Sequence, residues 1–135
     1  MSTELTNSTT PKPKGYKGNL EDGREIYIPN WSATTQWENL TQACKILGQT
    51  NVMTISTLNI PAAMLAVMGS DDSKSSTELL LHFIQQARME NEKITPASIE
   101  DLGMATIIEL FAHVMYAQYN SFFASGLAKA ASLTK

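Results

Sequence analysis

The segment that most constrains the fold spans residues 20–37, because it places a turn, a strand and a helix start in direct succession. Asp22 and Gly23 suit a tight hairpin turn, since glycine adopts positive φ angles freely and aspartate tolerates them better than most residues. Residues 16–20 and 24–28 flank this turn. We therefore predict an N-terminal β-hairpin, which must lie on a helix or another chain because two strands alone are marginally stable in water.

The second half of the segment predicts where the hairpin ends and the helical part begins. Ile26 and Ile28 fall on one face of the second strand, as expected for a half-buried strand. Pro29 cannot donate a hydrogen bond to a sheet and so ends the strand. Ser32 can then accept hydrogen bonds as the N-cap of a helix over about residues 33–47.

Most of the remaining chain has the apolar periodicity of helices. The fold class we predict is mainly α: a small helical bundle of four to five helices with an N-terminal β-hairpin. Residues 52–58 fit either a short helix or an irregular connector. The next expected element is a helix at 62–68. A further helix should begin with a capping box at Ser75 and Glu78 and run to about Asn91. A turn at 98–102 and a last helix from about Met104 to Ala124 should follow.

The chain length predicts a single domain with flexible ends. Residues 1–14 are polar and should be disordered, residues 15–126 should form the hairpin and bundle, and residues 127–135 should be a flexible tail after Gly126. The last helix is apolar nearly all round, so it should lie at the centre of the bundle or in an interface. That second setting would favour self-association as a homo-oligomer.

The charge distribution argues against nucleic acid as a partner. The net charge is −3, but residues 1–17 carry +2, which leaves −5 on the rest of the chain. An acidic body with two arginines does not form the basic groove that nucleic acids require. No run of about 20 apolar residues or signal-peptide pattern occurs, so we expect no membrane span and a cytoplasmic protein.

The sequence lacks the motifs of known catalytic and cofactor sites. Two Glu–His pairs share a helix face at a spacing of four residues: Glu78 with His82, and Glu109 with His113. Helical bundles that bind two metal ions use a spacing of three, Glu-x-x-His, and further carboxylates, so these pairs do not match such a site. Cys44 is the single cysteine and is expected to be a small core residue. No phosphate-binding loop, zinc motif or nucleophile elbow is present. We predict no enzyme activity, no cofactor and no metal.

Methionines and tryptophans are the candidates for contact with a protein partner. Seven methionines occur among 135 residues, and flexible thioethers fill irregular cores but also suit surfaces that accept varied apolar helices. The tryptophans are either anchors of the corner between hairpin and helix or partner hot spots. The candidate contact residues are Trp31, Trp37, Leu40, Met64, Met68 and Met115.

The junction resembles the start of tail assembly chaperones of tailed bacteriophages. In that family an Asp-Gly turn and a basic residue lead through alternating apolar residues to an aromatic residue, a serine or threonine, and a helix. The matching positions here are Asp22, Gly23, Arg24, Ile26, Ile28, Trp31 and Ser32. The resemblance is carried mainly by residues 20–48.

The resemblance implies a non-enzymatic assembly factor in the host cytoplasm. Such proteins coat the helical tape measure protein, help bring tail tube subunits to it and leave before the virion is complete, and many also have a frameshifted longer form. Two alternatives stay open. One is a permanent structural protein of the virion, such as a baseplate, hub or tail-completion subunit, and the other is a small regulatory protein that binds a host factor.

Overall fold

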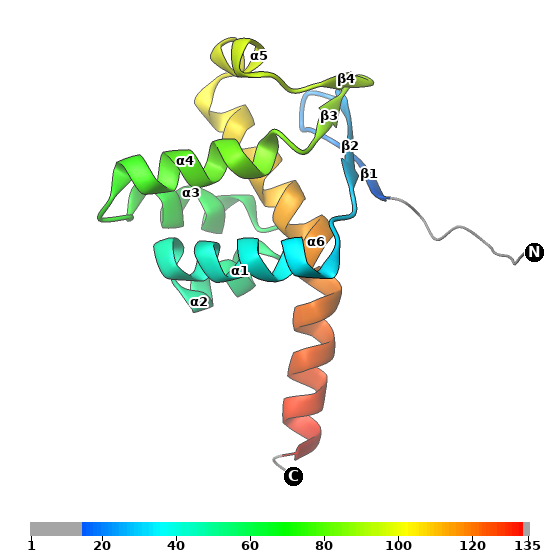
Figure 1. Cartoon of the computed structure of the whole chain (residues 1–135), viewed down its shortest axis with the longest axis vertical. Coiled ribbons are helices and arrows are strands. Elements are labelled where there is room, and N and C mark those ends of the chain that lie inside the picture. The colour runs from blue at the N-terminus through cyan, green and yellow to red at the C-terminus, as the bar shows by residue number, and fades with distance from the viewer. Residues whose placement is uncertain (1–14, 134–135) are drawn as a thin grey trace, which may run out of the picture.

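The computed structural model describes residues 15–133, with side chains described through residue 126. The predicted disordered tail at 1–14 lies outside the described residues. The fold is mainly α, with an N-terminal hairpin, as predicted (Figure 1). The elements are β1 (Gly15–Asn19), β2 (Glu25–Pro29), α1 (Ala33–Leu47), α2 (Gln49–Ile55), α3 (Ile60–Met68), α4 (Ser73–Ile84), β3 (Arg88–Met89), β4 (Glu92–Lys93), α5 (Pro96–Glu100) and α6 (Met104–Leu133).

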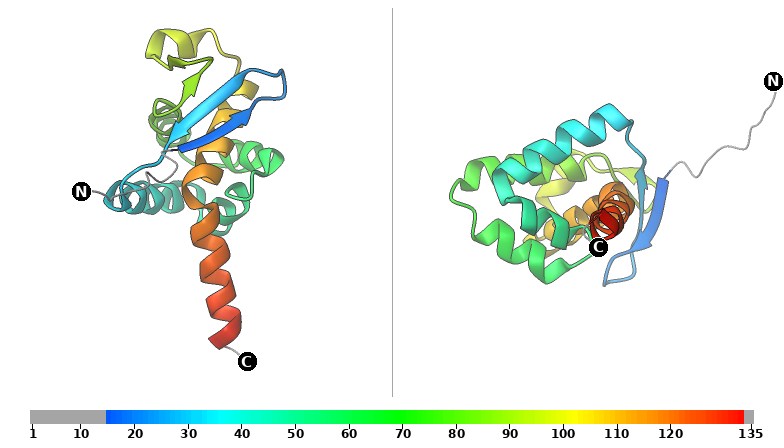
Figure 2. Two further views of the ribbon diagram at one scale, coloured as in Figure 1. Left: turned by 90° about the vertical axis from the view of Figure 1, so that its right-hand side faces the viewer. Right: turned by 90° about the horizontal axis from the view of Figure 1, so that it is seen from below.

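The N-terminal hairpin forms at the predicted turn. β1 and β2 pair antiparallel, with Tyr16 opposite Ile28, and Gly23 has a φ of 96° that a residue with a side chain rarely adopts. Ile26 and Ile28 are buried on the same face, which lies on the helical body (Figure 2). The hairpin is therefore held by its apolar face, as the alternation predicts.

The sheet is larger than predicted, because β3 pairs with β2 and β4 pairs with β3 in the order β1-β2-β3-β4. The prediction of a helix to Asn91 was wrong: α4 ends at Ile84, and residues 88–93 form a second, short hairpin. Glu90 and Asn91 both have positive φ, which is the geometry of a type I′ turn. Pairing with the edge of β2 outweighs the helical pattern of these residues.

The helix boundaries differ from the predicted ones at three further places. The N-cap of α4 is Asp72, which accepts a hydrogen bond from the Ser75 amide at 3.1 Å, in place of the predicted Ser75 capping box. Of the undecided segment 52–58, residues 52–55 are helical as part of α2 and residues 56–58 form a turn, and a short α5 brings the described helices to six. Gly126 does not end the last helix, since α6 continues to Leu133.

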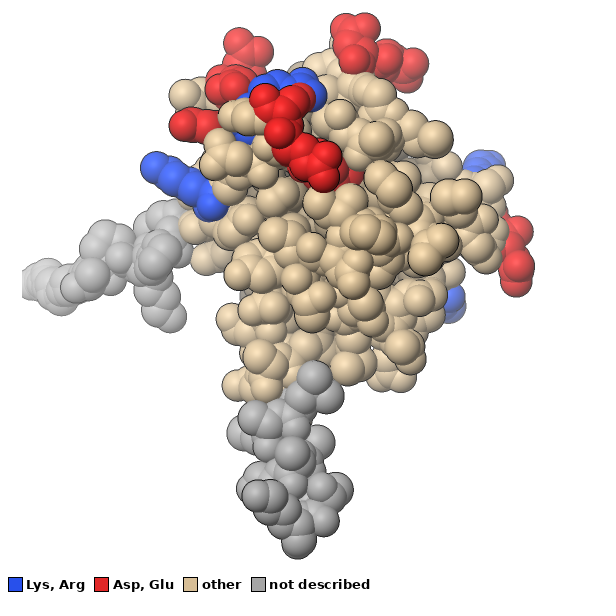
Figure 3. All heavy atoms as spheres, turned by 180° about the vertical axis from the view of Figure 1, so that it is seen from behind, with Lys and Arg blue, Asp and Glu red and all other residues tan. Residues whose placement is uncertain are grey.

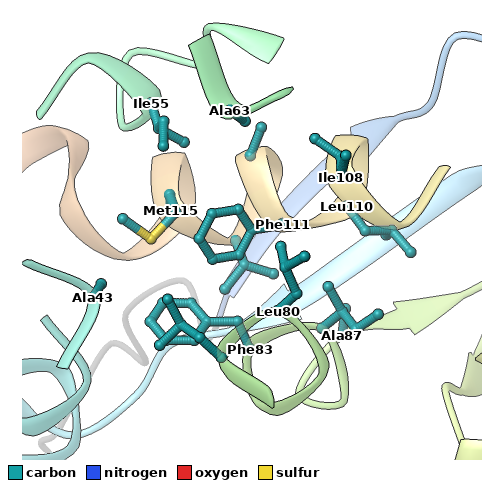
Figure 4. Packing of buried hydrophobic residues seen from close by; sticks show 14 of the residues in the cluster. Ala43, Ile55, Ala63, Leu80, Phe83, Ala87, Ile108, Leu110, Phe111 and Met115 are labelled. Atoms are coloured by element: carbon teal, nitrogen blue, oxygen red, sulfur yellow. The ribbon is translucent and has the colours of Figure 1, made fainter. Parts of the chain in front are cut away.

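Helix α6 passes through the centre of the molecule, and every residue from Ile108 to Met115 is buried (Figure 1). α2, α3 and α4 pack around it, and the hairpin covers another side (Figure 2). Phe83, Phe111 and Met115 meet in the middle of this core (Figure 4). The apolar last helix thus takes the central position that its sequence predicts.

Candidate protein-binding site

An apolar groove of about 510 Å³ opens on the surface where α3, α4 and the first turns of α6 meet. Its wall contains one hydroxyl, from Thr77, and no charged side chain. Met68 and Met104 border it and remain 77% and 79% exposed, respectively. The residues that line the groove are Met64, Val67, Met68, Thr77, Leu80, Leu81, Met104, Ala105, Ile107 and Ile108.

Local sequence signals place α3 in the wall of this groove. The Asn59 side chain caps α3 by accepting a hydrogen bond from the Ala62 amide at 3.0 Å, and Pro61 occupies the first turn, where a missing N–H costs nothing. Ala63 and Ala66 are buried against the body, whereas Leu65 is 71% exposed. α3 is apolar on both sides, so it completes the core and also offers an apolar surface.

The face that carries the groove has few charges. No Asp, Glu, Lys or Arg occurs in residues 46–70, which include α2 and α3, or in residues 110–128 of α6. From behind, Figure 3 shows a broad uncharged surface with acidic side chains gathered along its upper edge. Around the groove this surface is also apolar, and contiguous exposed apolar patches are typical of contacts with other molecules.

The predicted contact residues separate into exposed and buried sets. Met64 and Met68 line the groove, whereas Trp37 is 64% exposed on α1, away from it. Leu40 and Met115 are core residues in this structure, at 8% and 0% exposed. They are therefore placed to support the fold and cannot contact a partner in this conformation.

Trp31 lies half-buried at the corner between hairpin and helix. Its ring packs edge-on against Phe83 and Tyr119, with ring centroids 5.3 and 6.4 Å away. The buried Gln118 side chain holds the backbone here: its Oε1 accepts from the Trp31 amide, and its Nε2 donates to the Pro29 carbonyl. No sequence pattern indicated Gln118, because its Trp31 and Pro29 partners lie almost 90 residues away in the chain.

The groove residues on α4 were not predicted as contact residues, and those on α6 were predicted only as part of a last helix that lies at the centre of the bundle or in an interface. Leu80, Leu81 and Ile107 belong to the apolar stripes of their helices, and such stripes predict core. The signal in the sequence was the width of the apolar faces. The apolar residues of α4 and α6 are numerous enough to form part of the core and also the wall of the groove. In the folded chain, α3, α4 and α6 leave part of these faces uncovered, and that part lines the groove.

The two Glu–His pairs do not form a joint site. His82 contacts Asn39, with 3.0 Å between His82 Nε2 and Asn39 Oδ1. Glu109 and His113 are buried and both turn toward the hairpin: Glu109 accepts from the Glu21 amide at 2.7 Å, and Tyr16 lies 3.1 Å from His113 Nδ1. Among the described residues, no group of three His, Cys, Asp or Glu could hold a metal ion.

The burial of His113 makes stability depend on pH. Burial lowers the pKa of His113 below its usual 6.5, so the folded state binds fewer protons than the unfolded state. The free energy of unfolding should therefore fall as the pH drops from 6.5 toward the folded pKa. Urea titrations between pH 7.5 and 5 should show this slope in the wild type and a flatter one in His113→Gln.

The matched control for that experiment is His82→Gln, since His82 is exposed. Burial raises the pKa of Glu109, so its contribution has the opposite sign and increases as the pH falls. The difference between wild type and His113→Gln isolates the histidine. Identical slopes in these two proteins would show that His113 is protonated without cost in the folded state.

The residues that line the groove include no titratable group. Cys44 is half-buried on α1, and burial raises the pKa of its thiol, which makes it a weak nucleophile. Within residues 15–133, no helix is long and apolar enough to cross a membrane.

Comparison with known proteins finds a family match. The sequence model of the family described as "Phage tail assembly chaperone protein, TAC" matches residues 22–129, from the hairpin turn to the last turns of α6. No curated protein and no solved structure matches the chain. The match covers well over half of the chain, so this protein belongs to the phage tail assembly chaperone family.

Proposed function

We propose that this chaperone binds apolar helical segments of the tape measure protein in the groove between α3, α4 and α6, in the host cytoplasm. It would keep those segments from aggregating and help to bring tail tube subunits to them. The observation that carries the proposal is an exposed groove with an apolar wall and two methionines at its border. A groove of this kind accepts the apolar face of an amphipathic helix.

The chemistry of the wall suits a partner with many similar segments. Met64, Met68 and Met104 can change rotamer at little cost, so the groove can adapt to side chains of different size. Binding without charged contacts gives little sequence specificity. A protein that covers many turns of a long helix needs such tolerance.

Replacing Met68 by glutamate should weaken capture of the tape measure protein at least tenfold. The new carboxylate would lie in the apolar wall, and burying it without a partner is costly. Because Met68 is exposed, the fold should be kept. The measurement is co-expression with the tape measure protein, followed by size-exclusion chromatography and quantification of the co-eluting chains.

Leu65→Glu is the matched control, because Leu65 lies on the same helix, is similarly exposed and does not line the groove. Co-elution should be unchanged in this variant. Equal co-elution of Met68→Glu and Leu65→Glu would place the binding site elsewhere. A folded wild-type chain that never co-elutes with the tape measure protein would refute the proposed function.

One observation favours the alternative of a permanent virion component. β1 is an edge strand, and within the described residues no strand pairs with its outer side. A neighbouring subunit could add a strand there. Mass spectrometry of purified virions separates the two functions, since a chaperone should be absent from them and a structural subunit present.

A further inference from the structure

A hollow of about 490 Å³ adjoins the groove at the N-terminal end of α3. Met64 lines both, so the groove and the hollow meet at this side chain. The turn of the β1–β2 hairpin lies on one side of the hollow, and the chain that leads into α3 lies on the other (Figure 2). The residues that line the hollow are Glu21, Thr57, Leu58, Asn59, Ile60, Pro61 and Met64.

One face of α3 lines the groove and the hollow together. Ile60, Pro61 and Met64 line the hollow, and Met64, Val67 and Met68 line the groove. At 100° per residue, these five side chains fall within about 120° of the helix circumference. Pro61 and Met68 are seven residues apart, which is about 10 Å along the axis at 1.5 Å per residue. A helix that lies along this face can therefore contact the groove and the hollow at the same time.

The hollow differs from the groove because it contains a charge. Glu21 is its one charged lining residue and is exposed. The other two polar side chains are used within their own segments. Thr57 Oγ1 donates to the Thr54 carbonyl at 2.7 Å, and Asn59 Oδ1 accepts from the Ala62 amide at 3.0 Å. The Glu21 carboxylate is thus the group in the hollow that is free to bind a partner.

The charges around Glu21 favour a cation there. The carboxylate of Glu109 lies against the hairpin turn and accepts from the Glu21 amide at 2.7 Å. Within the described residues, the one ion pair joins Arg24 to Asp22, so the nearby cation is already taken. Burial raises the pKa of Glu109, and the negative charges of Glu21 and Asp22 raise it further. This end of α3 therefore has negative charge that no cation of the chain balances, and it attracts a basic side chain.

We propose that the hollow holds a lysine or arginine side chain of the helix that binds in the groove, with Glu21 as its ion-pair partner. The inference rests on the proposed function, since it describes the same bound segment. That segment is an amphipathic helix with a basic residue about two turns from the apolar side chain that contacts Met68. Apolar burial in the groove supplies most of the affinity, and the contact with Glu21 selects the segments that fit and sets their register.

The test uses the full-length chain and designed peptides. The first probe is an alanine-rich peptide of about 18 residues, long enough to form a helix, with a lysine at position i and leucines at i+4, i+7 and i+8. A second peptide has the reverse order, because a helix can lie in either direction along α3. Matched peptides carry glutamine in place of the lysine, and fluorescence anisotropy gives the affinities.

In at least one of the two orders, the lysine peptide should bind about fivefold more tightly than its glutamine counterpart at low salt. This ratio should approach one in about 1 M sodium chloride, where exposed charges are screened. Equal binding of the lysine and glutamine peptides in both orders at low salt would overturn the inference.

Variants of Glu21 show whether this side chain is responsible. Glu21→Gln should abolish the advantage of the lysine peptide, and Glu21→Lys should favour a peptide with glutamate at the same position. Glu78→Gln is the matched control, because Glu78 is exposed on α4 and lines neither the groove nor the hollow. It should keep the lysine advantage. An advantage that persists in Glu21→Gln, with unchanged helical circular dichroism, would also overturn the inference.

The outcomes for the two proposals are separable. Met68→Glu should weaken binding of every peptide, whether or not it carries lysine. If it does so but lysine gives no advantage, the role of Glu21 alone fails. If the lysine advantage depends on Glu21 but the tape measure protein never co-elutes with the wild-type chain, the proposed function alone fails. If no peptide binds the wild type, the inference is overturned, and the co-expression experiment still decides the proposed function.

Discussion

Replacing Phe83 by alanine should lower the free energy of unfolding by about 4 kcal/mol, a large part of the stability of a small domain. Phe83 is fully buried and its ring packs edge-on against Trp31 and Phe111, each with centroids 5.3 Å away. The truncation would leave a cavity where α4, α6 and the corner after the hairpin meet. Urea denaturation followed by circular dichroism at pH 7 measures the loss.

Phe83→Leu is the control that separates the cavity from the aromatic contacts. Leucine keeps most of the volume, so this variant should lose only about 1–2 kcal/mol. Thr54→Ala, at an exposed position of α2, should change stability by less than about 0.5 kcal/mol. Equal losses in Phe83→Ala and Phe83→Leu would mean that ring packing, and not volume, determines the stability of this core.

Replacing Gln118 by leucine should lower the free energy of unfolding by about 3 kcal/mol. Gln118 is 6% exposed and pairs with the Trp31 amide at 3.2 Å and the Pro29 carbonyl at 2.8 Å. Leucine fills the space but leaves both backbone groups without their partner, and each such group costs about 1–3 kcal/mol. The same urea titration provides the value.

Gln36→Ala is the matched control for this prediction. Gln36 Nε2 donates to Gln118 Oε1 at 3.1 Å, and its loss leaves the two backbone contacts of Gln118 in place. We expect a decrease of about 1 kcal/mol. A Gln118→Leu protein as stable as Gln36→Ala would indicate that water satisfies the corner in place of the amide.

Elements whose stabilising contacts join residues close together in the chain could be predicted from the sequence. The Ser32 side chain accepts from the Thr35 amide and α1 spans residues 33–47, as expected. The Asp-Gly turn and the burial of Ile26 and Ile28 were also predicted correctly. In each case the interacting groups are only a few residues apart or follow a simple period, so the local chain carries the information.

Elements that depend on distant partners could not be predicted this way. The predicted helix to Asn91 included residues 88 and 89, yet these two residues form β3 and pair with β2 some 60 residues earlier. α1 shows the same limit, since the large apolar side chain of Trp37 is 64% exposed whereas the small Ala43 on the same helix is buried. Periodicity identifies an apolar face without showing which part of it another element covers.

Some features of the candidate site could likewise be predicted from the sequence, and others could not. By itself, the sequence determined the apolar helices, the Met64 and Met68 positions on α3, and the absence of charge over residues 46–70, because these are properties of residue type and order. Only the tertiary structure decided that Met115 and Leu40 are core and that the groove opens between α3, α4 and α6. The physical reason is that burial depends on how helices from distant parts of the chain cross, and the packing of the whole core sets that crossing.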